Sequence, residues 1–345
     1  MTKDSFSRRQ FLAQTTGAAT AGLAAAAAPS ALFAHQTAVK PADNSSADLA
    51  IVDCHQHLWD LARFKLPWIK PGTLLGRSYV MKDYLAATLG TGIQQAVYME
   101  VDVDPSQQQA EVDHLTEICQ SGTAPTVAAV VSGRPASDDF KTYIGQFKDN
   151  RYVKGIRQVL HGGGTPAGYC LAADFVRGIR QLGELGLSFD LCMRPGELSD
   201  GAKLADECRE TRFILDHCGN GDPKAFFKSG DPRLADVKAE HNADAWKRDI
   251  ERLAAKKNVI CKISGIVARV PKEWSPGDLA PVVNHCLDAF GPERIIFGSD
   301  WPVCLMGAPL AQWVAALRQV ISERPTAEQE SLLRKNAVIF YGLKS

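Results

Sequence analysis

Histidine and aspartate side chains that could bind a metal ion or activate water stand at the ends of short apolar runs. His55 and His57 come at the end of the run 49–54, Leu-Ala-Ile-Val-Asp-Cys. Because they are two residues apart, their imidazoles share one face of an extended strand. Two imidazoles on one face form half of a metal site, although a His-x-His pair is a weak indication by itself.

A third histidine and an aspartate complete this set. His217 stands in the run 215–220, Leu-Asp-His-Cys-Gly-Asn, and Asp300 stands in the run 297–302, Phe-Gly-Ser-Asp-Trp-Pro. Three nitrogen atoms and one carboxylate oxygen suit a single divalent ion, above all zinc, with one open position for water. We therefore predict a metal site formed by His55, His57, His217 and Asp300.

Five further residues stand beside these positions and are predicted to bind the substrate. They are Glu100, Arg157, His161, Trp59 and Trp301. Structural roles stay open for four of them: Arg157 as a salt-bridge partner, the two tryptophans as packing beneath loops, and His161 as a solvated loop residue.

Two other cationic residues also lie near predicted strand ends, and we interpret both as structural. They are Arg194 and Lys262.

The elements that must position these residues alternate along the chain. Eight apolar runs predict strands at 49–54, 93–99, 125–131, 152–157, 186–192, 212–217, 258–264 and 293–299. Helical patterns are predicted at 106–120, 138–148, 172–184, 199–210, 244–256, 276–290, 309–322 and 326–336. This alternation predicts an α/β fold with parallel strands, a single-domain (β/α)8 TIM barrel. In such a barrel the carboxyl ends of the strands form one mouth, where these residues would meet.

Composition excludes several classes of protein. The chain of 345 residues carries 39 Lys+Arg and 39 Asp+Glu, so its formal net charge is zero. A nucleic-acid-binding protein needs a basic excess, so we expect no nucleic-acid partner. No Gly-x-Gly-x-x-Gly follows the first predicted strand, which removes the main support for a dinucleotide-binding fold.

The first 34 residues have the layout of an export signal. Lys3, Arg8 and Arg9 give a basic start, and no Asp, Glu, Lys or Arg occurs from Gln10 to Val39. Ser-Arg-Arg-Gln-Phe-Leu is similar to the bacterial twin-arginine motif. We therefore predict a twin-arginine-type signal peptide at 1–34, a linker at 35–48 and a catalytic domain at 49–345. The twin-arginine translocation machinery is the expected partner, and the mature chain would be periplasmic or secreted without a stable membrane span.

The nine cysteines do not form a recognisable framework. Their number is odd and no Cys-x-x-Cys pair occurs. Several lie within the apolar runs, so we interpret most of them as small buried hydrophobic residues. A disulfide stays possible.

Three motifs taken together resemble the amidohydrolase superfamily. They are Asp-x-His-x-His-Leu-Trp at 53–59, Asp-His-x-Gly at 216–219 and Gly-Ser-Asp-Trp-Pro at 298–302, and the tail 336–343 is similar too. In particular, the sequence resembles the amidohydrolase-2 branch and its hydrolases of L-fuconolactone or L-rhamnonolactone type. The resemblance covers residues 49–345 and implies a hydrolase of a small-molecule sugar lactone.

The resemblance also implies catalytic roles. His55 and His57 would hold a metal or the substrate carbonyl, and His217 would be a third ligand or an electrophilic partner. Asp300 would be the general base that activates water.

The sequence departs from the superfamily pattern in three places. Two-metal members carry a carboxylated Lys at the end of strand four, where this chain has Arg157. A two-metal site is therefore disfavoured, and Arg157 would instead hold a substrate oxygen. The run 186–192 supplies no third histidine, and Glu100 replaces an amide and could be an extra ligand or acid. A metal-independent lactonase therefore stays open. So do a metal-dependent decarboxylase of the same branch and a non-catalytic periplasmic sugar-acid-binding relative.

Overall fold

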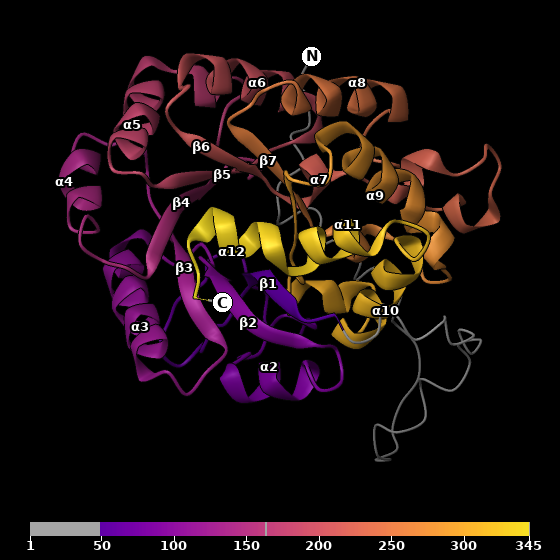
Figure 1. Cartoon of the computed structure of the whole chain (residues 1–345), viewed down its shortest axis with the longest axis horizontal. Helices are drawn as coiled ribbons and strands as arrows, with labels where there is room; N and C mark the ends of the chain where they lie inside the picture. Colours follow the sequence, from indigo (N-terminus) through magenta and orange to yellow (C-terminus); the bar gives the residue numbers. More distant parts are fainter. Residues whose placement is uncertain (1–48, 163, 345) are drawn as a thin grey trace.

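Eight parallel strands form one sheet that curls into a nearly closed barrel (Figure 1). The computed structural model describes residues 49–162 and 164–344, so the predicted signal peptide 1–34 and linker 35–48 lie outside the described residues. Each strand pairs with the next one along the chain. The strands are β1 Ile51–Gln56, β2 Ile93–Met99, β3 Thr126–Ser132, β4 Val153–Val159, β5 Ser188–Cys192, β6 Arg212–Leu215, β7 Val259–Ile263 and β8 Ile295–Phe297.

The barrel closes where the chain after β8 meets β1. Backbone hydrogen bonds run from Asp300 N to His55 O at 2.9 Å and from His57 N to Trp301 O at 2.8 Å. Two predicted catalytic segments, the end of β1 and the turn after β8, are therefore joined by the closure itself. This arrangement confirms the predicted barrel of eight parallel strands.

Helices surround the strands (Figure 1). They are α2 Met81–Ala87, α3 Gln108–Ser121, α4 Phe140–Gly145, α5 Ala173–Glu184, α6 Leu198–Glu207, α7 His217–Asn220, α8 Ala243–Ala254, α9 Pro276–Phe290, α10 Leu310–Val320, α11 Thr326–Glu330 and α12 Asn336–Tyr341. The single helix predicted at 326–336 is longer and divided, because a π-helical turn at Ser331–Lys335 joins α11 to α12. Gly342, with φ of 58°, ends α12 in the left-handed conformation that glycine favours.

The interior of the barrel has an apolar floor. Val52, Val97, Val130 and Ile260 belong to a buried cluster that Tyr341 of α12 joins. In Figure 1, α12 lies across the strands on the side facing the viewer. Strands buried on both faces read as continuous apolar runs, which is why the sequence pattern predicted them.

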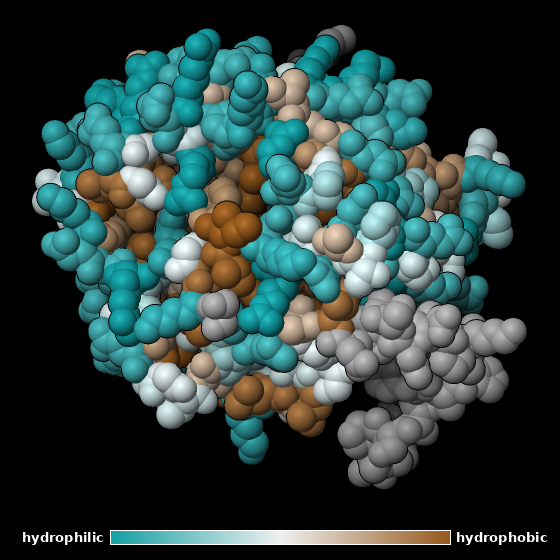
Figure 2. Space-filling view, viewed as in Figure 1, coloured by the Kyte–Doolittle hydropathy of each residue, from teal (hydrophilic) through white to brown (hydrophobic). Residues whose placement is uncertain are grey.

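The outer surface is mixed in character. Figure 2 shows this face as largely hydrophilic, with separate apolar patches over α12 and α2. Leu89 and Ile339, 77% and 78% exposed, are the most exposed large apolar side chains in the described part of the chain. None of the helices at 49–162 and 164–344 has the length and apolar character needed to cross a membrane. All nine cysteines are buried and unpaired, as the interpretation of small hydrophobic residues expects.

A buried carboxylate fixes the connection that follows β2. Oε1 of Glu111, on α3, accepts hydrogen bonds from the Tyr98 hydroxyl and the Val101 backbone amide, both at 2.9 Å. Burial and the repulsion of Glu100 raise the pKa of Glu111 to about 8. Glu111 therefore holds a proton at neutral pH and supports the loop that carries Glu100.

Replacing Glu111 with Gln tests this proton. The folded chain keeps a proton on Glu111 that the unfolded chain releases above its ordinary pKa of 4.5. Wild-type stability should therefore fall as pH rises from about 5 to about 8, by at most about 1.4 kcal/mol per pH unit from this group. Glu111→Gln should flatten that part of the profile in urea unfolding, whereas Glu328→Gln on α11 should leave it unchanged. Identical profiles for Glu111→Gln and the wild type would contradict the assignment.

Candidate active site

The predicted ligand residues meet at the carboxyl ends of the strands. His55 lies on β1 and His57 just after it, His217 follows β6, and Asp300 follows β8. Asp300 Oδ1 lies 3.2 Å from His57 Nε2 and 3.6 Å from His55 Nε2. The ring centroids of His55 and His217 are 4.5 Å apart. The tertiary structure thus brings together four residues spread over 245 positions of the chain.

Unusual backbone conformations aim two of these side chains. His217 has φ of 55° and Asp300 has φ of 56°, in the left-handed region that residues other than glycine seldom occupy. β6 ends at Leu215, two residues earlier than predicted, because the chain turns in this conformation from His217 onward. Strain of this kind is characteristic of functional sites.

Asp53 holds the turn that carries Asp300. Its two carboxylate oxygens accept hydrogen bonds from the Ser299 backbone amide at 2.7 Å and the Ser299 hydroxyl at 2.6 Å. The Tyr84 hydroxyl of α2 donates to Asp53 at 2.7 Å. The first residue of the Asp-x-His-x-His motif therefore positions the base of the last motif, a role that sequence analysis did not assign.

Glycines make room for the histidines. A Cβ on Gly265, which has φ of 69°, would lie 2.3 Å from His217 Nδ1, and a Cβ on Gly298 would lie 2.6 Å from His55 Cβ. The His217 ring also contacts the Ser264 hydroxyl through Nδ1 at 3.0 Å. The orientation of His217 is therefore set by the backbone after β7.

The environment fixes the ionisation of Asp300 and His217. Burial alone would raise the pKa of Asp300, but the neighbouring imidazoles of His217, His57 and His55 hold it well below its usual range. Burial lowers the pKa of His217 to about 4. At neutral pH, Asp300 is therefore a carboxylate and His217 is a neutral imidazole. Their exposed fractions, 4% and 7%, exceed those of His55 and His57, which are 0% and 2% exposed.

His57 and Asp300 face each other in a way that calls for a cation between them. His57 Nδ1 lies 2.9 Å from the backbone carbonyl of Met99, which can only accept, so Nδ1 carries the proton. The remaining lone pair on Nε2 then points at a carboxylate oxygen 3.2 Å away. A proton on Nε2 turns this contact into the hydrogen bond through which His57 lowers the pKa of Asp300, and a metal ion between the two groups would relieve the repulsion in the same way. These two residues therefore fit a bound divalent cation.

The other predicted ligands fit such an ion less well. The ligand atoms of His55, His57 and Asp300 lie within 4.8 Å of one another, whereas His217 groups with His55 and Asp216. Both ring nitrogens of His55 also face cations. Lys262 Nζ lies 3.3 Å from Nδ1, and Arg157 Nη1 lies 3.2 Å from Nε2.

Lys262 belongs to a network that sequence analysis did not foresee. Its ammonium group lies 2.6 Å from Asp190 Oδ2 and 2.8 Å from Asp216 Oδ1, and all three side chains are fully buried. Burial alone would lower the pKa of Lys262, but the two carboxylates raise it well above its ordinary value. The sequence analysis interpreted Lys262 as structural but did not identify these two partners.

Arg157 and Glu100, predicted to bind substrate, form a buried ion pair. Arg157 Nε lies 2.6 Å from Glu100 Oε1, and Arg157 Nη2 donates to the Glu100 carbonyl at 2.6 Å. The alternative role of Arg157, as a salt-bridge partner, therefore accounts for its Nε and Nη2 atoms. Only Nη1 points toward His55, and a contact with substrate stays a prediction.

The predicted substrate-binding tryptophans are packed within an aromatic group. Trp59 packs edge-on against Trp68 and Tyr79, and its indole donates to the Arg77 carbonyl at 2.7 Å. Trp301 packs against Tyr79 and Tyr84. Both tryptophans are 2% exposed, which matches a packing role beneath loops, and their contact with a substrate stays a prediction.

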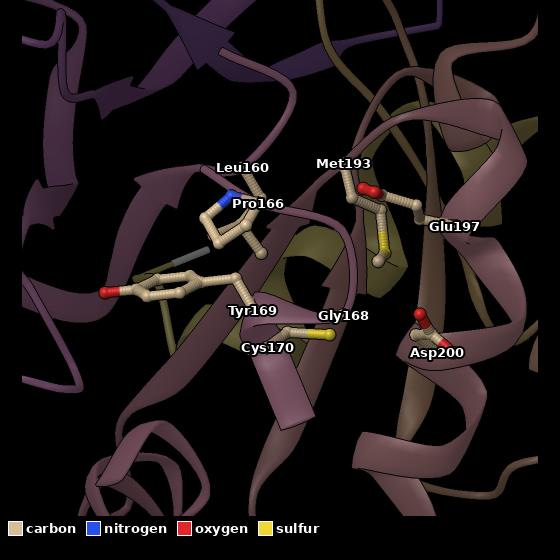
Figure 3. A pocket seen from close by; sticks show the side chains of 8 residues that line it. All are labelled: Leu160, Pro166, Gly168, Tyr169, Cys170, Met193, Glu197 and Asp200. Atoms are coloured by element: carbon tan, nitrogen blue, oxygen red, sulfur yellow. The ribbon is translucent and has the colours of Figure 1, made fainter. Parts of the chain in front are cut away.

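His161 lies in the loop after β4, partly exposed, next to a small cavity. Figure 3 shows the cavity, which has a volume of about 10 Å³ and includes Leu160, Tyr169 and Met193 in its lining. A space of this size holds at most about one water molecule. Arg194, interpreted as structural, lies 2.7 Å from Glu197 and donates to the Gly162 carbonyl at 3.1 Å. Arg194 therefore ties the loop after β4 to the segment after β5.

Known proteins are similar over most of the chain. Residues 52–343 match the Amidohydrolase family (Amidohydro_2). An L-fucono-1,5-lactonase of Burkholderia multivorans is 27% identical over 82% of this chain and 92% of its own length. One of Burkholderia ambifaria is 26% identical over 77% and 85%. A solved amidohydrolase structure from Burkholderia multivorans with bound zinc is 24% identical, with a TM-score of 0.72 over 86% of this chain and all of that one.

Gly265→Ala tests whether the backbone after β7 positions His217. The added Cβ would collide with the imidazole, so we expect turnover to fall by about 10²-fold, as for a displacement of about 1 Å at a catalytic group. Gly122→Ala is the matched control, because Gly122 has φ of 63° and no heavy atom lies within 4 Å of the new Cβ. Both variants carry the strain of a left-handed alanine, but only Gly265→Ala adds a collision with His217. Equal activity in the two variants would contradict the positioning of His217.

Proposed function

The chain belongs to the amidohydrolase family, and from that premise we propose that it hydrolyses the ring ester of a sugar-derived lactone. The observation that carries the proposal is the position of the Asp300 carboxylate at the mouth of the barrel, where Oδ1 lies 3.2 Å from His57 Nε2 and 3.6 Å from His55 Nε2. A carboxylate beside imidazoles can take a proton from water and return it to a leaving oxygen. The two lactonase-named relatives support a lactone as the substrate.

The reaction would proceed in two steps at Asp300. Water attacks the lactone carbonyl carbon while the carboxylate takes one of its protons. The ring C–O bond of the tetrahedral intermediate then breaks, and the proton passes to the alkoxide, which leaves a hydroxy acid. His55 and His217 flank the carboxylate and would stabilise the oxyanion. A lactone releases an alkoxide, a better leaving group than the nitrogen anion that an amide would release, so this set of groups can suffice.

The cofactor and the substrate contacts are part of the same proposal. A divalent ion, zinc in a similar solved structure, would be held by His57 and Asp300, with His55 and His217 as further candidates, and would supply a Lewis acid for water. Arg157 Nη1, the side chain of His161 and the loop after β4 would contact ring and hydroxyl oxygens. Glu100 acts through its ion pair with Arg157.

Asp300→Asn tests the base. An amide keeps the shape of the side chain but cannot take the proton, so we expect turnover of aldonolactones to fall by about 10³-fold. Acid release is measured on a panel of aldonolactones, with circular dichroism to check folding. Asp288→Asn on α9, at a carboxylate whose side chain is 68% exposed, is the matched control and should keep full activity. Full activity of Asp300→Asn would refute its role.

Adding aromatic carboxylates and sugar acids to this panel separates a lactonase from a decarboxylase and from a binding protein. Carbon dioxide release from an aromatic or sugar carboxylate, without lactone hydrolysis, would identify the decarboxylase. Saturable binding of a sugar acid without turnover of any substrate would identify the binding protein.

We also propose that the full chain is exported through the twin-arginine route, on the Ser-Arg-Arg-Gln-Phe-Leu motif. Arg8→Lys with Arg9→Lys keeps the charge but removes the guanidinium pair, so the double variant should stay in the cytoplasm. Cell fractionation of a bacterial host and the mass of the processed protein measure this. The expected mass change corresponds to cleavage near Ala34. Equal periplasmic amounts of variant and wild type would exclude this route.

A further inference from the structure

Two groups that can only donate hydrogen bonds lie against the ring nitrogens of His55, and the Asp216 carboxylate oxygen Oδ1 lies 3.5 Å from Nδ1. Lys262 Nζ lies 3.3 Å from Nδ1, and Arg157 Nη1 lies 3.2 Å from Nε2. A neutral imidazole has one lone pair, so it accepts from one of these cations and turns an N–H toward the other side. A metal ion would need the same lone pair.

The contacts of Lys262 hold its ammonium group against His55. An ammonium group has three protons, and Lys262 has three acceptors within 3.3 Å: Asp190 Oδ2, Asp216 Oδ1 and His55 Nδ1. Arg157 Nη1 faces Nε2 on the other side of the ring. In either tautomer, the lone pair of His55 therefore faces a cation, Lys262 at Nδ1 or Arg157 at Nε2.

Lys262 has no room to leave this position. The side chain is 0% exposed, and the space beside it is so narrow that a Cβ on Gly298 would lie 3.2 Å from Lys262 Cδ and 2.6 Å from His55 Cβ. Both of its carboxylate partners are fully buried as well. A buried charge without a partner is costly, so the network holds the ammonium group against His55.

We propose that Lys262 is a positioning residue that, together with Arg157, keeps a metal ion off His55. The positive charges of Lys262 and Arg157 lie at the two ring nitrogens through which His55 would bind a divalent ion, and like charges repel. His55 then takes part in the reaction as an imidazole beside Asp300 and not as a metal ligand. Only this last statement rests on the proposed function.

The test measures bound metal, with and without the Lys262 charge. Full-length wild type and Lys262→Met are each equilibrated with ZnCl2, dialysed and analysed by inductively coupled plasma mass spectrometry. Wild type, in which only His57 and Asp300 are left to hold an ion, should retain less than one zinc ion per chain after dialysis. Lys262→Met should retain about one zinc ion per chain, because His55 and Asp216 regain free ligand atoms. Its activity, where present, should become sensitive to the chelator.

Lys154→Met is the matched control. Lys154 lies on β4 and is partly exposed, and the same substitution there should leave the zinc content at the wild-type level. A general loosening of the barrel would raise zinc binding in both variants, which would overturn the proposal.

A second variant covers a failure of Lys262→Met to fold. Asp190→Asn with Lys262→Met removes one charge of each sign, so one buried carboxylate fewer is left unpaired. This double variant should gain zinc as well. Two results overturn the proposal: wild type that already retains one zinc ion per chain, and a folded Lys262 variant that retains no more zinc than wild type. Zinc content is measured without substrate, so a failure of the lactonase proposal would appear separately, as wild type without acid release.

Discussion

The ammonium group of Lys262 holds the charged layer of the barrel together. Through Asp190, Asp216 and His55 it links β7 to β5, to the end of β6 and to β1. Buried charges are tolerated only when they are paired and hydrogen-bonded, so each of these residues constrains the others. The ion pair of Arg157 with Glu100 does the same between β4 and the end of β2. Together these pairs join strands that are distant around the barrel.

This charged layer lies above an apolar floor, and the contrast explains how the site works. The buried valine and isoleucine side chains below it exclude water, and α12 closes that side with Tyr341. In such surroundings electrostatic interactions are stronger than in water. Asp300 stays ionised because three imidazoles surround it, and His217 stays neutral because it is buried. One carboxylate base beside neutral imidazoles is a set of groups suited to hydrolysis.

The same barrel can supply positive charge to a reacting oxygen in different ways. The pair of His57 and Asp300 is arranged for a cation, whereas His55 already has two cationic side chains against its ring. The fold does not decide between these modes, because it sets only where strand ends lie. The choice depends on which side chains the strands direct into the mouth, and Lys262 of β7 is the one that sequence motifs did not include.

The sequence by itself determined the order of the elements and the residues at the mouth. Strands buried on both faces must be apolar, so their runs were recognisable, and the predicted ranges 93–99 and 276–290 coincide with β2 and α9. His55, His57, His217 and Asp300 were found because they end such runs.

Only the tertiary structure decided which partners the buried charged and aromatic side chains have. Lys262 pairs with Asp190 and Asp216, and Arg157 forms an ion pair with Glu100. The two tryptophans of the motifs are buried. A charged side chain within a buried apolar strand must be paired with another polar or charged group. Which partner it finds depends on the register and closure of the barrel, which bring Lys262 against residues 46 and 72 positions away in the chain.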